Sequence, residues 1–515
     1  MKQILSRAAL TSDLAIIIYL ALADLLLHFL TNSHYGYFRD ELYYIACGEH
    51  LAWGYADQPP LIAVIARLSR VLMGDSLFAL RFFPAVAGAL LVFVAGLIAR
   101  AFGGRRFAVA LTTLAVIIMP VYLYLHTVLT MNAFEPLFWM LDVYLVVLII
   151  RDGRTRLWLW FGVVSGVGLL NKHSMLLFGF AIVVGLLLTP ARKFLFNRWL
   201  VLGGLIAALI FLPNIIWEMR HDWATIEVLR NAAVNQNLPV TPFQFFTGQL
   251  QLTHPLTLPL WLGGLGCFLF APAFKPYRAL GWSYLVMFVL LIVLKGKVYY
   301  LAPAYPMLFA AGAVGLERLT EVRWRKTILR PAALVLLLIG GSILAPLTLP
   351  VLPVETYIRY AQRLGLAEIK TERLRTGALP QHYADMFGWP ELTATVADAF
   401  HRLPPEEQAR CAIFGRNYGE AAAIDFFGPR YGLPKAISKH QNYWLWGPRN
   451  YTGECVLTVG EKLADVQQTF KQVEQVATFT HPYVMPYENN LPILLCHQPK
   501  ASLQTIWPRI KCYSC

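Results

Sequence analysis

A short acidic and basic segment near the N-terminus has the residue types needed for acid–base chemistry. Residues 37–50 read YFRDELYYIACGEH, which places Arg39, Asp40 and Glu41 side by side at the start of an amphipathic stretch, and Asp57 follows in the sequence DQPPL. A carboxylate within hydrogen-bond reach of a hydroxyl group can remove its proton as the hydroxyl attacks. Acidic residues at a helix start also stabilise the helix electrostatically, so both interpretations stay open on these residues alone.

Several cations that could bind an anionic group lie close to the ends of apolar runs. They are Arg39, Lys172, Arg220, Lys295 and Lys297. Charge-assisted hydrogen bonds from Lys or Arg bind phosphate well, but cations at the ends of membrane spans also extend towards lipid headgroups. Lys172 lies in a tight connection between two apolar segments, a position that favours the phosphate-binding interpretation.

The composition identifies a membrane protein. Of the 515 residues, 57% are hydrophobic and 14% are charged, whereas soluble domains carry about 25% charged residues. The net charge is +14, but the basic residues come in short clusters between apolar runs of about 20 residues, the length that spans a bilayer. This pattern excludes nucleic-acid binding.

The hydropathy pattern predicts eleven membrane spans, and therefore an all-α polytopic membrane protein with a small C-terminal α/β domain. The expected spans are residues 13–30, 80–101, 107–125, 133–150, 157–170, 174–189, 199–217, 255–271, 279–294, 299–316 and 330–348. Alternate short loops are rich in Lys and Arg, as in Arg151, Arg154 and Arg156, which predicts that these loops and the N-terminus are cytoplasmic.

Two domains are expected. Residues 1–350 form a transmembrane domain with long outer loops at 31–76 and 218–254, and residues 351–515 form an outer α/β domain. In the latter, strands are predicted at 411–414 and 455–459, with a helix at 418–427. Five of the seven cysteines lie in this tail, so an extracytoplasmic location would permit a disulfide.

The order of these motifs resembles a known superfamily. The pattern RDE opening a loop helix, followed by DQPPL, is similar to the GT-C glycosyltransferases that use polyprenyl-phosphate sugars, most of all the protein O-mannosyltransferase branch (family 39) and the lipid A aminoarabinose transferases (family 83). The segments GVGLLNK at 166–172, PNIIW at 213–217 and KVYYLAPAYP at 297–306 fit the same branch. The resemblance covers most of residues 14–316.

The resemblance implies a role for each candidate residue. Asp40 corresponds to the general base, Glu41 and Asp57 would orient the acceptor or a metal, and the cations above, chiefly Lys172 with Lys295 or Lys297, would hold the lipid phosphate. Direct displacement would invert the anomeric centre. Lipid A transferases carry Glu-Lys where this chain has Asp57-Gln58, so the carboxylate is kept and the cation is lost.

Some members of this branch hold a divalent metal with the carboxylate at the position of Asp57, and His221 and His254 would complete an oxygen–nitrogen ligand set here. Implied partners are a polyprenyl-phosphate-sugar donor, membrane lipids and an extracytoplasmic acceptor, which is a protein, lipid A or a glycan. The implied location is a bacterial inner membrane, with the C-terminal domain in the periplasm or outside the cell.

Acidic residues lie within the expected spans, where a charge is costly. Glu135 near Asn132 is placed to face the site, Asp142 is expected to bond a neighbouring helix, and Asp24 has no assigned role. The alternative function is a polyprenyl-lipid transporter or flippase, which predicts acids along a path through the bilayer and broken helices at its midplane. The charged groups concentrate on one face, which favours the enzyme over the transporter and over a lipid-binding scaffold.

Overall fold

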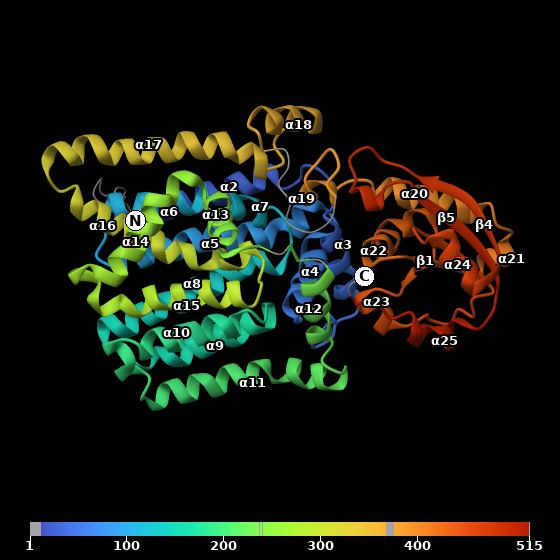
Figure 1. Cartoon of the computed structure of the whole chain (residues 1–515), viewed down its shortest axis with the longest axis horizontal. Coiled ribbons are helices and arrows are strands. Elements are labelled where there is room, and N and C mark those ends of the chain that lie inside the picture. The colour runs from blue at the N-terminus through green and yellow to red at the C-terminus, as the bar shows by residue number, and fades with distance from the viewer. Residues whose placement is uncertain (1–11, 236, 239, 367–374, 514–515) are drawn as a thin grey trace, which may run out of the picture. The chain divides into compact units, whose positions relative to one another are not determined.

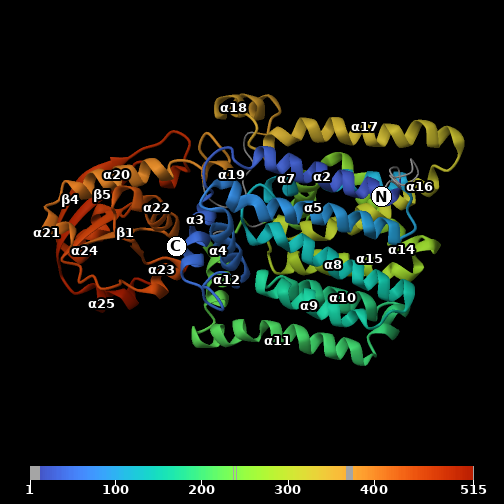
Figure 2. The same cartoon turned by 180° about the vertical axis from the view of Figure 1, so that it is seen from behind.

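The computed structural model describes residues 12–235, 237–238, 240–366 and 375–513. The chain divides into two compact units (Figures 1 and 2). Unit 1 contains residues 1–34, 73–216 and 239–352, and unit 2 contains residues 35–72, 217–238 and 353–515. Most of the first expected outer loop, and the first half of the second, therefore belong to the same unit as the C-terminal segment.

Unit 1 is a bundle of helices, most of which run roughly along a common direction (Figure 1). Its α-helices are α2 (Asp13–Thr31), α5 (Leu77–Ala101), α6 (Arg106–Ile117), α7 (Pro120–Leu125), α8 (Met131–Asp152), α9 (Leu157–Asn171), α10 (Met175–Leu187), α11 (Arg198–Arg220), α13 (Pro242–Thr253), α14 (Leu258–Phe270), α15 (Arg278–Val293), α16 (Tyr305–Leu319) and α17 (Arg323–Thr348). Short 3-10 helices are η1 (Pro190–Phe194), η2 (Pro255–Thr257), η3 (Pro272–Tyr277) and η4 (Val298–Ala304).

Helices occur at all eleven expected span positions, but they are not eleven uniform spans. Within the described residues, seven helices are long and apolar enough to cross a bilayer, and three shorter apolar helices are α6, α9 and α10. The span expected at 107–125 is broken, because Pro120 lacks a backbone N–H and begins a new helix, α7. The span expected at 255–271 is part of a pair, α13 with η2 and α14, that is bent by 101°.

Close helix packing in unit 1 depends on small residues. Gly264 on α14 faces α16, where a Cβ atom would lie 2.0 Å from the carbonyl oxygen of Leu308. Gly312 on α16 faces back, and its Cβ atom would lie 1.9 Å from the carbonyl oxygen of Leu260. Apolar side chains gain little from leaving one apolar environment for another in a bilayer, so helices associate through such close contacts.

Unit 2 combines helices with one five-stranded sheet. Its helices are α3 (Arg39–Glu49), α4 (Leu61–Met73), α12 (Ala224–Asn235), α18 (Val354–Arg363), α19 (Gln381–Ala384), α20 (Trp389–His401), α21 (Pro405–Gln408), α22 (Tyr418–Phe427), α23 (Gln441–Trp446), α24 (Leu463–Thr469) and α25 (Leu503–Ile506), with η5 (Gly428–Tyr431), η6 (Pro486–Glu488) and η7 (Trp507–Arg509). Its strands are β1 (Cys411–Gly415), β2 (Ile437–Ser438), β3 (Cys455–Val459), β4 (Phe470–Phe479) and β5 (Leu491–Pro499).

The sheet has the order β2-β1-β3-β5-β4, with β1 parallel to β2 and β3 and with β5 antiparallel to β3 and β4. Both predicted strands, β1 and β3, and the predicted helix α22 are confirmed. Every residue of β1 and β3 is buried, as expected for central strands covered on both faces. Cys411 and Cys455 are register partners on these strands and form a disulfide, so the tail does contain one.

Candidate active site

The acidic segment RDE forms the first turn of α3 in unit 2. The helix begins at Arg39, and Phe38 is the N-cap residue. The side chain of Glu41 is fully buried, and its Oε2 atom accepts a hydrogen bond of 2.8 Å from the backbone N–H of Phe38. Glu41 thus satisfies a backbone donor that the helix leaves unpaired. The capping interpretation therefore describes Glu41, whereas Asp40 is held differently.

Asp40 is partly exposed and is held by a residue from the C-terminal segment. The hydroxyl of Tyr418 donates a hydrogen bond of 2.6 Å to Asp40 Oδ1, and Arg39 Nε lies 3.6 Å from the same oxygen. The side chain of Asp40 is 30% exposed. Among the described residues, no hydrogen bond reaches Oδ2, so one carboxylate oxygen is fixed and the other keeps its lone pairs available.

Asp57 is bound to α3 by a tyrosine. The hydroxyl of Tyr43 donates to Asp57 Oδ1 at 2.9 Å, and the side-chain oxygen of Asn442 on α23 accepts a hydrogen bond of 2.6 Å from the neighbouring backbone N–H of Ala56. Burial raises the pKa of Asp57 to about 7; the Tyr43 hydrogen bond opposes this and the charge of Asp40 adds to it. Asp57 therefore changes its protonation state close to neutral pH.

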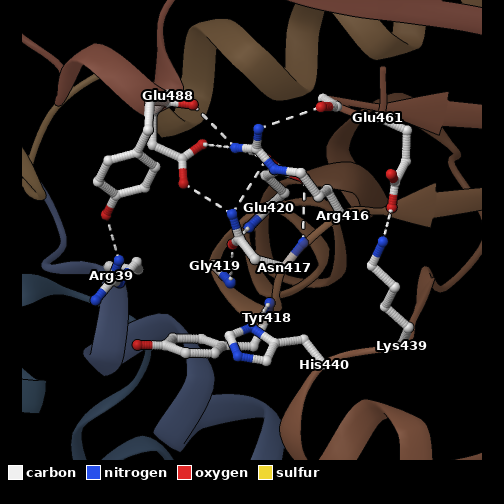
Figure 3. A network of polar contacts seen from close by, with 12 residues as sticks. Arg39, Arg416, Asn417, Tyr418, Gly419, Glu420, Lys439, His440, Glu461 and Glu488 are labelled. Atoms are coloured by element: carbon white, nitrogen blue, oxygen red, sulfur yellow. Dashed lines mark hydrogen bonds and ion pairs between the residues drawn. The ribbon is translucent and has the colours of Figure 1, made fainter. Parts of the chain in front are cut away.

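Arg39 is already paired in this structure. Its Nη1 atom donates to the hydroxyl of Tyr487, and its Nη2 atom lies 3.8 Å from Asp385 Oδ2. Its guanidinium carbon lies 5.2 Å from the centre of the Tyr418 ring (Figure 3). Its side chain is 17% exposed. These contacts fix the geometry around Asp40, so the predicted phosphate-binding role of Arg39 gains no direct support from its surroundings.

A buried polar network positions Tyr418 at the start of α22 (Figure 3). The side-chain oxygen of Asn417 accepts hydrogen bonds from the backbone N–H groups of Gly419 and Glu420, at 2.8 and 3.1 Å. Arg416 Nη2 lies 3.1 Å from Glu420 Oε1 and 3.7 Å from Glu488 Oε2. Burial and the nearby Glu488 raise the pKa of Glu420 well above its usual value, against the effect of Arg416.

Sequence reasoning missed Tyr418 and Tyr43 as members of this site. Asn417 is the N-cap residue of α22, and its side chain caps the start of this helix. The sequence does place Tyr418 directly after Asn417, a typical N-cap residue, so a position at the start of a helix could have been predicted for it. The sequence alone does not predict which acidic residue the hydroxyl of Tyr418 contacts.

In unit 1, Lys172 lies at the C-cap of α9 and is engaged by α8. Its Nζ atom lies 2.7 Å from Glu135 Oε2 and 2.7 Å from Asn132 Oδ1. Nζ also lies 4.3 Å from the centre of the Tyr300 ring and 5.9 Å from that of Tyr299. The side chains of Lys172 and Glu135 are 13% and 5% exposed. The predicted segments around residues 135, 172 and 299 are thus brought together.

The remaining candidate cations are Lys297, Lys295 and Arg220. Lys297 is the N-cap residue of η4, the element that carries Tyr299 and Tyr300. Lys295 is exposed and adopts a positive φ of 53°, and Arg220 is exposed at the end of α11. Asp142, as expected, bonds a neighbouring helix: Ser165 Oγ on α9 donates to it at 2.6 Å.

Each of the predicted metal ligands has another contact in the structure. Asp57 bonds Tyr43, His221 Nδ1 lies 2.8 Å from the carbonyl oxygen of Trp217, and His254 Nδ1 accepts from the backbone N–H of Leu256 at 3.1 Å. Asp57 and His221 belong to unit 2 and His254 belongs to unit 1. A metal ion held by these three side chains stays a prediction.

Sequence comparisons point to glycosyltransferases. Residues 57–217 match the dolichyl-phosphate-mannose-protein mannosyltransferase family. The chain is also 25% identical over 311 residues to the lipid A galacturonosyltransferase RgtD of Rhizobium johnstonii, an alignment that covers 56% of this chain and 62% of that protein. The matched region thus spans less than two thirds of that relative.

Solved structures give the fold. The structure of ArnT from Cupriavidus metallidurans bound to undecaprenyl phosphate matches with a TM-score of 0.60 at 15% identity, covering 93% of this chain and 97% of that one. The arabinofuranosyltransferase AftD from Mycobacteria matches with a TM-score of 0.54 at 13% identity, covering 93% of this chain and 40% of that one. Part of the sequence thus resembles membrane glycosyltransferases that use lipid-linked sugars, and the chain has the fold of ArnT.

Proposed function

We propose that the protein transfers a sugar from a polyprenyl monophosphate to an extracytoplasmic acceptor, with Asp40 as the general base and with inversion at the anomeric carbon. One observation carries the proposal: Asp40 is partly exposed, one of its oxygens is fixed by Tyr418, and the described residues leave the other without a hydrogen bond. A general base needs this combination of fixed orientation and an accessible lone pair.

The reaction is a single displacement. Asp40 Oδ2 takes the proton of the acceptor hydroxyl as the hydroxyl oxygen attacks the anomeric carbon. The bond between that carbon and the phosphate oxygen breaks, and the electron pair leaves with the polyprenyl phosphate. Attack from the face opposite the leaving group inverts the anomeric centre, and the tyrosine hydroxyl at Oδ1 keeps the carboxylate in place.

The donor is proposed from the relatives and from the cations. A structure of ArnT holds undecaprenyl phosphate, and ArnT shares this fold. In this chain Lys172 would hold the phosphate together with Lys297 or Lys295, and Arg39 and Arg220 are the remaining candidates. Because Lys172 is paired with Glu135, phosphate binding would have to share or replace that contact. The Tyr300 ring beside Nζ would keep the ammonium group in position.

The acceptor would lie outside the cytoplasm. Disulfides persist in oxidising compartments, so the Cys411–Cys455 bond supports a periplasmic or extracellular location for the C-terminal segment. The spans would lie in a bacterial inner membrane, as the family resemblance implies. RgtD is named as acting on lipid A, which makes lipid A one candidate acceptor beside a protein or a glycan. Asp57 would orient the acceptor, and Glu41 would act by holding the helix start that carries Asp40.

The experiment measures transfer of radiolabelled sugar from synthetic polyprenyl-phosphate donors by the purified full chain, with membrane extract as acceptor. We expect Asp40→Asn to abolish transfer and Tyr418→Phe to lower it while substrate binding stays intact. Asp398→Asn, which alters an exposed carboxylate on α20, is the matched control and should keep wild-type transfer. NMR of the product should show the inverted anomer.

Two outcomes would contradict the proposal. Full transfer by a folded Asp40→Asn variant would remove the assigned base. Absence of transfer from every donor, together with movement of the labelled lipid across a vesicle membrane, would instead support the flippase.

A further inference from the structure

Three buried polar side chains come together in unit 1, and none of them has a role in the reaction proposed above. Asp24 and His28 lie one turn apart on α2, and His126 lies at the C-cap of α7. Their exposed fractions are 2%, 0% and 2%. One ligand atom from each lies within 4.8 Å of the others. Ionisable side chains buried within a membrane cost free energy unless a partner of opposite charge or a hydrogen bond offsets that cost, and they often mark a functional site.

The contacts of Thr127 indicate which ring nitrogen of a neutral His28 carries the proton. The hydroxyl of Thr127 donates its single proton to the carbonyl oxygen of Leu123 at 2.7 Å. The same hydroxyl oxygen lies 3.3 Å from His28 Nδ1, so Nδ1 must be the donor in that contact. Neutral His28 therefore carries its proton on Nδ1 and presents the lone pair of Nε2 to the other side of the ring.

That lone pair faces a carboxylate. His28 Nε2 lies 3.7 Å from Asp24 Oδ1, which is too far for a hydrogen bond. Asp24 Oδ2, His28 Nε2 and His126 Nε2 are all buried, and none of them has a hydrogen-bond partner among the described residues. Lone pairs that face one another across such a distance repel unless a proton or a metal cation lies between them.

The backbone leaves room beside this cluster. Gly88 on α5 faces it, and a Cβ atom at Gly88 would lie 2.7 Å from His126 Cγ and Nδ1 and 3.1 Å from Asp24 Oδ2. Any larger residue would displace the imidazole or the carboxylate. The absence of a side chain at this position therefore maintains the arrangement of the other two.

We propose that Asp24, His28 and His126 bind a divalent transition-metal ion such as zinc. Two imidazole nitrogens and one carboxylate oxygen are a common zinc ligand set, and ligand atoms on one tetrahedral ion lie about 3.4 Å apart. The 3.7 Å separation of Asp24 Oδ1 and His28 Nε2 is close to that value. Thr127 is a positioning residue, because it orients the ring of His28 through Nδ1.

The ion has a structural consequence for the neighbouring cluster. It ties α2 to the segment 126–130, which leads directly into α8. Thr130 is the N-cap residue of α8, and the first two turns of that helix carry Asn132 and Glu135, the partners of Lys172. Metal binding would thus fix the start of the helix that holds Lys172.

The other group of closely spaced ligand-type residues among those described carries no such proposal. It consists of Glu407, Cys455 and His497, but the sulfur of Cys455 is already bonded to Cys411. Its sulfur atom is therefore not a thiolate that could bind a metal.

The test measures zinc bound to the purified full chain in nanodiscs. The protein is stripped with a chelator, loaded with zinc sulfate, washed and analysed by mass spectrometry for metal content. We expect about one ion per chain in the wild type, at least a 10- to 100-fold weaker zinc affinity in Asp24→Asn and His126→Gln, and a comparable loss in Thr127→Val, because changes behind metal ligands have effects of this size.

His254→Gln is the matched control. His254 is also buried in unit 1 with an unpartnered Nε2, but it does not belong to the cluster, so the variant should keep the ion. Loss of zinc in this variant would point to the Asp57, His221 and His254 set and contradict the proposal. So would full zinc occupancy in Asp24→Asn and His126→Gln, or no bound zinc in the wild type.

A second measurement needs no variant. X-ray absorption of the zinc-loaded wild type should give only nitrogen and oxygen neighbours at about 2.0–2.2 Å, with two imidazoles. A sulfur neighbour, or a spectrum without imidazole, would overturn the assignment. If a proton shared between Asp24 and His28 compensates the cluster instead, the wild type will bind no zinc.

Discussion

Two buried acids in unit 1 are compensated in opposite ways. Glu135 on α8 has the ammonium group of Lys172 at 2.7 Å and the hydroxyl of Ser174 on its other oxygen. Asp24 on α2 faces His28 at 3.7 Å, and its Oδ2 atom has no hydrogen-bond partner among the described residues. Both side chains are at most 5% exposed. The chain therefore supplies the ammonium group of Lys172 to one acid and two imidazoles to the other.

The two sites should therefore differ in how their stability responds to a substitution or to added metal ions. In a completed ion pair the protein loses most when one partner is removed, because the other charge stays buried. If the Asp24 cluster binds a metal ion as proposed, it stabilises the protein only when the ion is bound. Its contribution to the free energy of unfolding then depends on the metal concentration. Glu135 should therefore be recognised by the loss of stability when its partner is removed, and Asp24 by a stability that depends on added metal.

The largest effect is expected from Lys172→Met. This change leaves the charge of Glu135 buried without its partner and should destabilise the protein by about 3–5 kcal/mol. Unfolding of the purified protein in nanodiscs measures it. The double variant Lys172→Met with Glu135→Gln should recover most of the loss, because it removes both charges. Equal unfolding of the single variant and the wild type would mean that Glu135 is not charged in the folded protein.

The next effect is expected from zinc itself. At a free zinc concentration of about 100 times the dissociation constant, the ion should stabilise the wild type by about 2.7 kcal/mol. Asp24→Asn should lose this gain, and in chelator it should unfold no more easily than the wild type, because an amide is less costly to bury than a carboxylate. Thermal unfolding of both proteins, measured with zinc and with chelator, separates the stabilisation by zinc from the effect of the substitution itself. An identical zinc response in both proteins would contradict the cluster.

Asp57 extends the comparison to a carboxylate of unit 2. Its pKa rises from 3.8 to about 7 on folding, chiefly through burial. The folded state therefore holds this proton more tightly than the unfolded state, and the contribution of Asp57 to stability falls as the pH rises from about 4 to about 7. The slope is at most about 1.4 kcal/mol per pH unit.

Unfolding midpoints between pH 4 and pH 8 test this, with Asp57→Asn as the comparison. The variant should lack this fall, and the gap between the two proteins should widen with pH until about 7 and then stay constant. Parallel pH profiles would mean that Asp57 is ionised in the folded state throughout this range.

The smallest effect is expected from Lys435→Met in unit 2. Lys435 Nζ lies 2.7 Å from Glu49 Oε2, the same distance as between Lys172 and Glu135, but the two side chains are 38% and 27% exposed. Water compensates Glu49 when Lys435 is removed, and Arg70 lies 3.0 Å from its other oxygen. We expect a loss of less than about 1 kcal/mol in the same unfolding assay. A loss as large as that of Lys172→Met would show that burial does not set the difference.

Much of the fold could be predicted because its elements depend on local sequence. Hydropathy located helices at every expected span, and the apolar runs at 411–414 and 455–459 located the central strands. The predictions were wrong where a local feature interrupts a run, as at Pro120, which divides one expected span between α6 and α7. Periodicity reports which residues are apolar, whereas a proline decides where the backbone hydrogen bonds stop.

The candidate site was predictable only in part. Asp40 stood out because adjacent charges at the end of an apolar run are unusual, and Lys172 stood out because it lies between two short apolar helices. Tyr418 contacts Asp40 from 378 residues further along the chain, a pairing that no local pattern encodes. The Asp24 cluster was also invisible, because His126 approaches α2 only through the packing of α7.

The sequence by itself determined that this protein lies in a membrane, where its helices and central strands fall, and which superfamily its first loop resembles. These properties depend on hydrophobicity, backbone propensity and short motifs, all of which are local. Only the tertiary structure decided that Glu41 caps a helix while Asp40 keeps an accessible oxygen, that Lys172 is paired with Glu135, and that two histidines converge on Asp24. The electrostatic state of a buried group is set by the atoms packed around it, and those atoms come from distant parts of the chain.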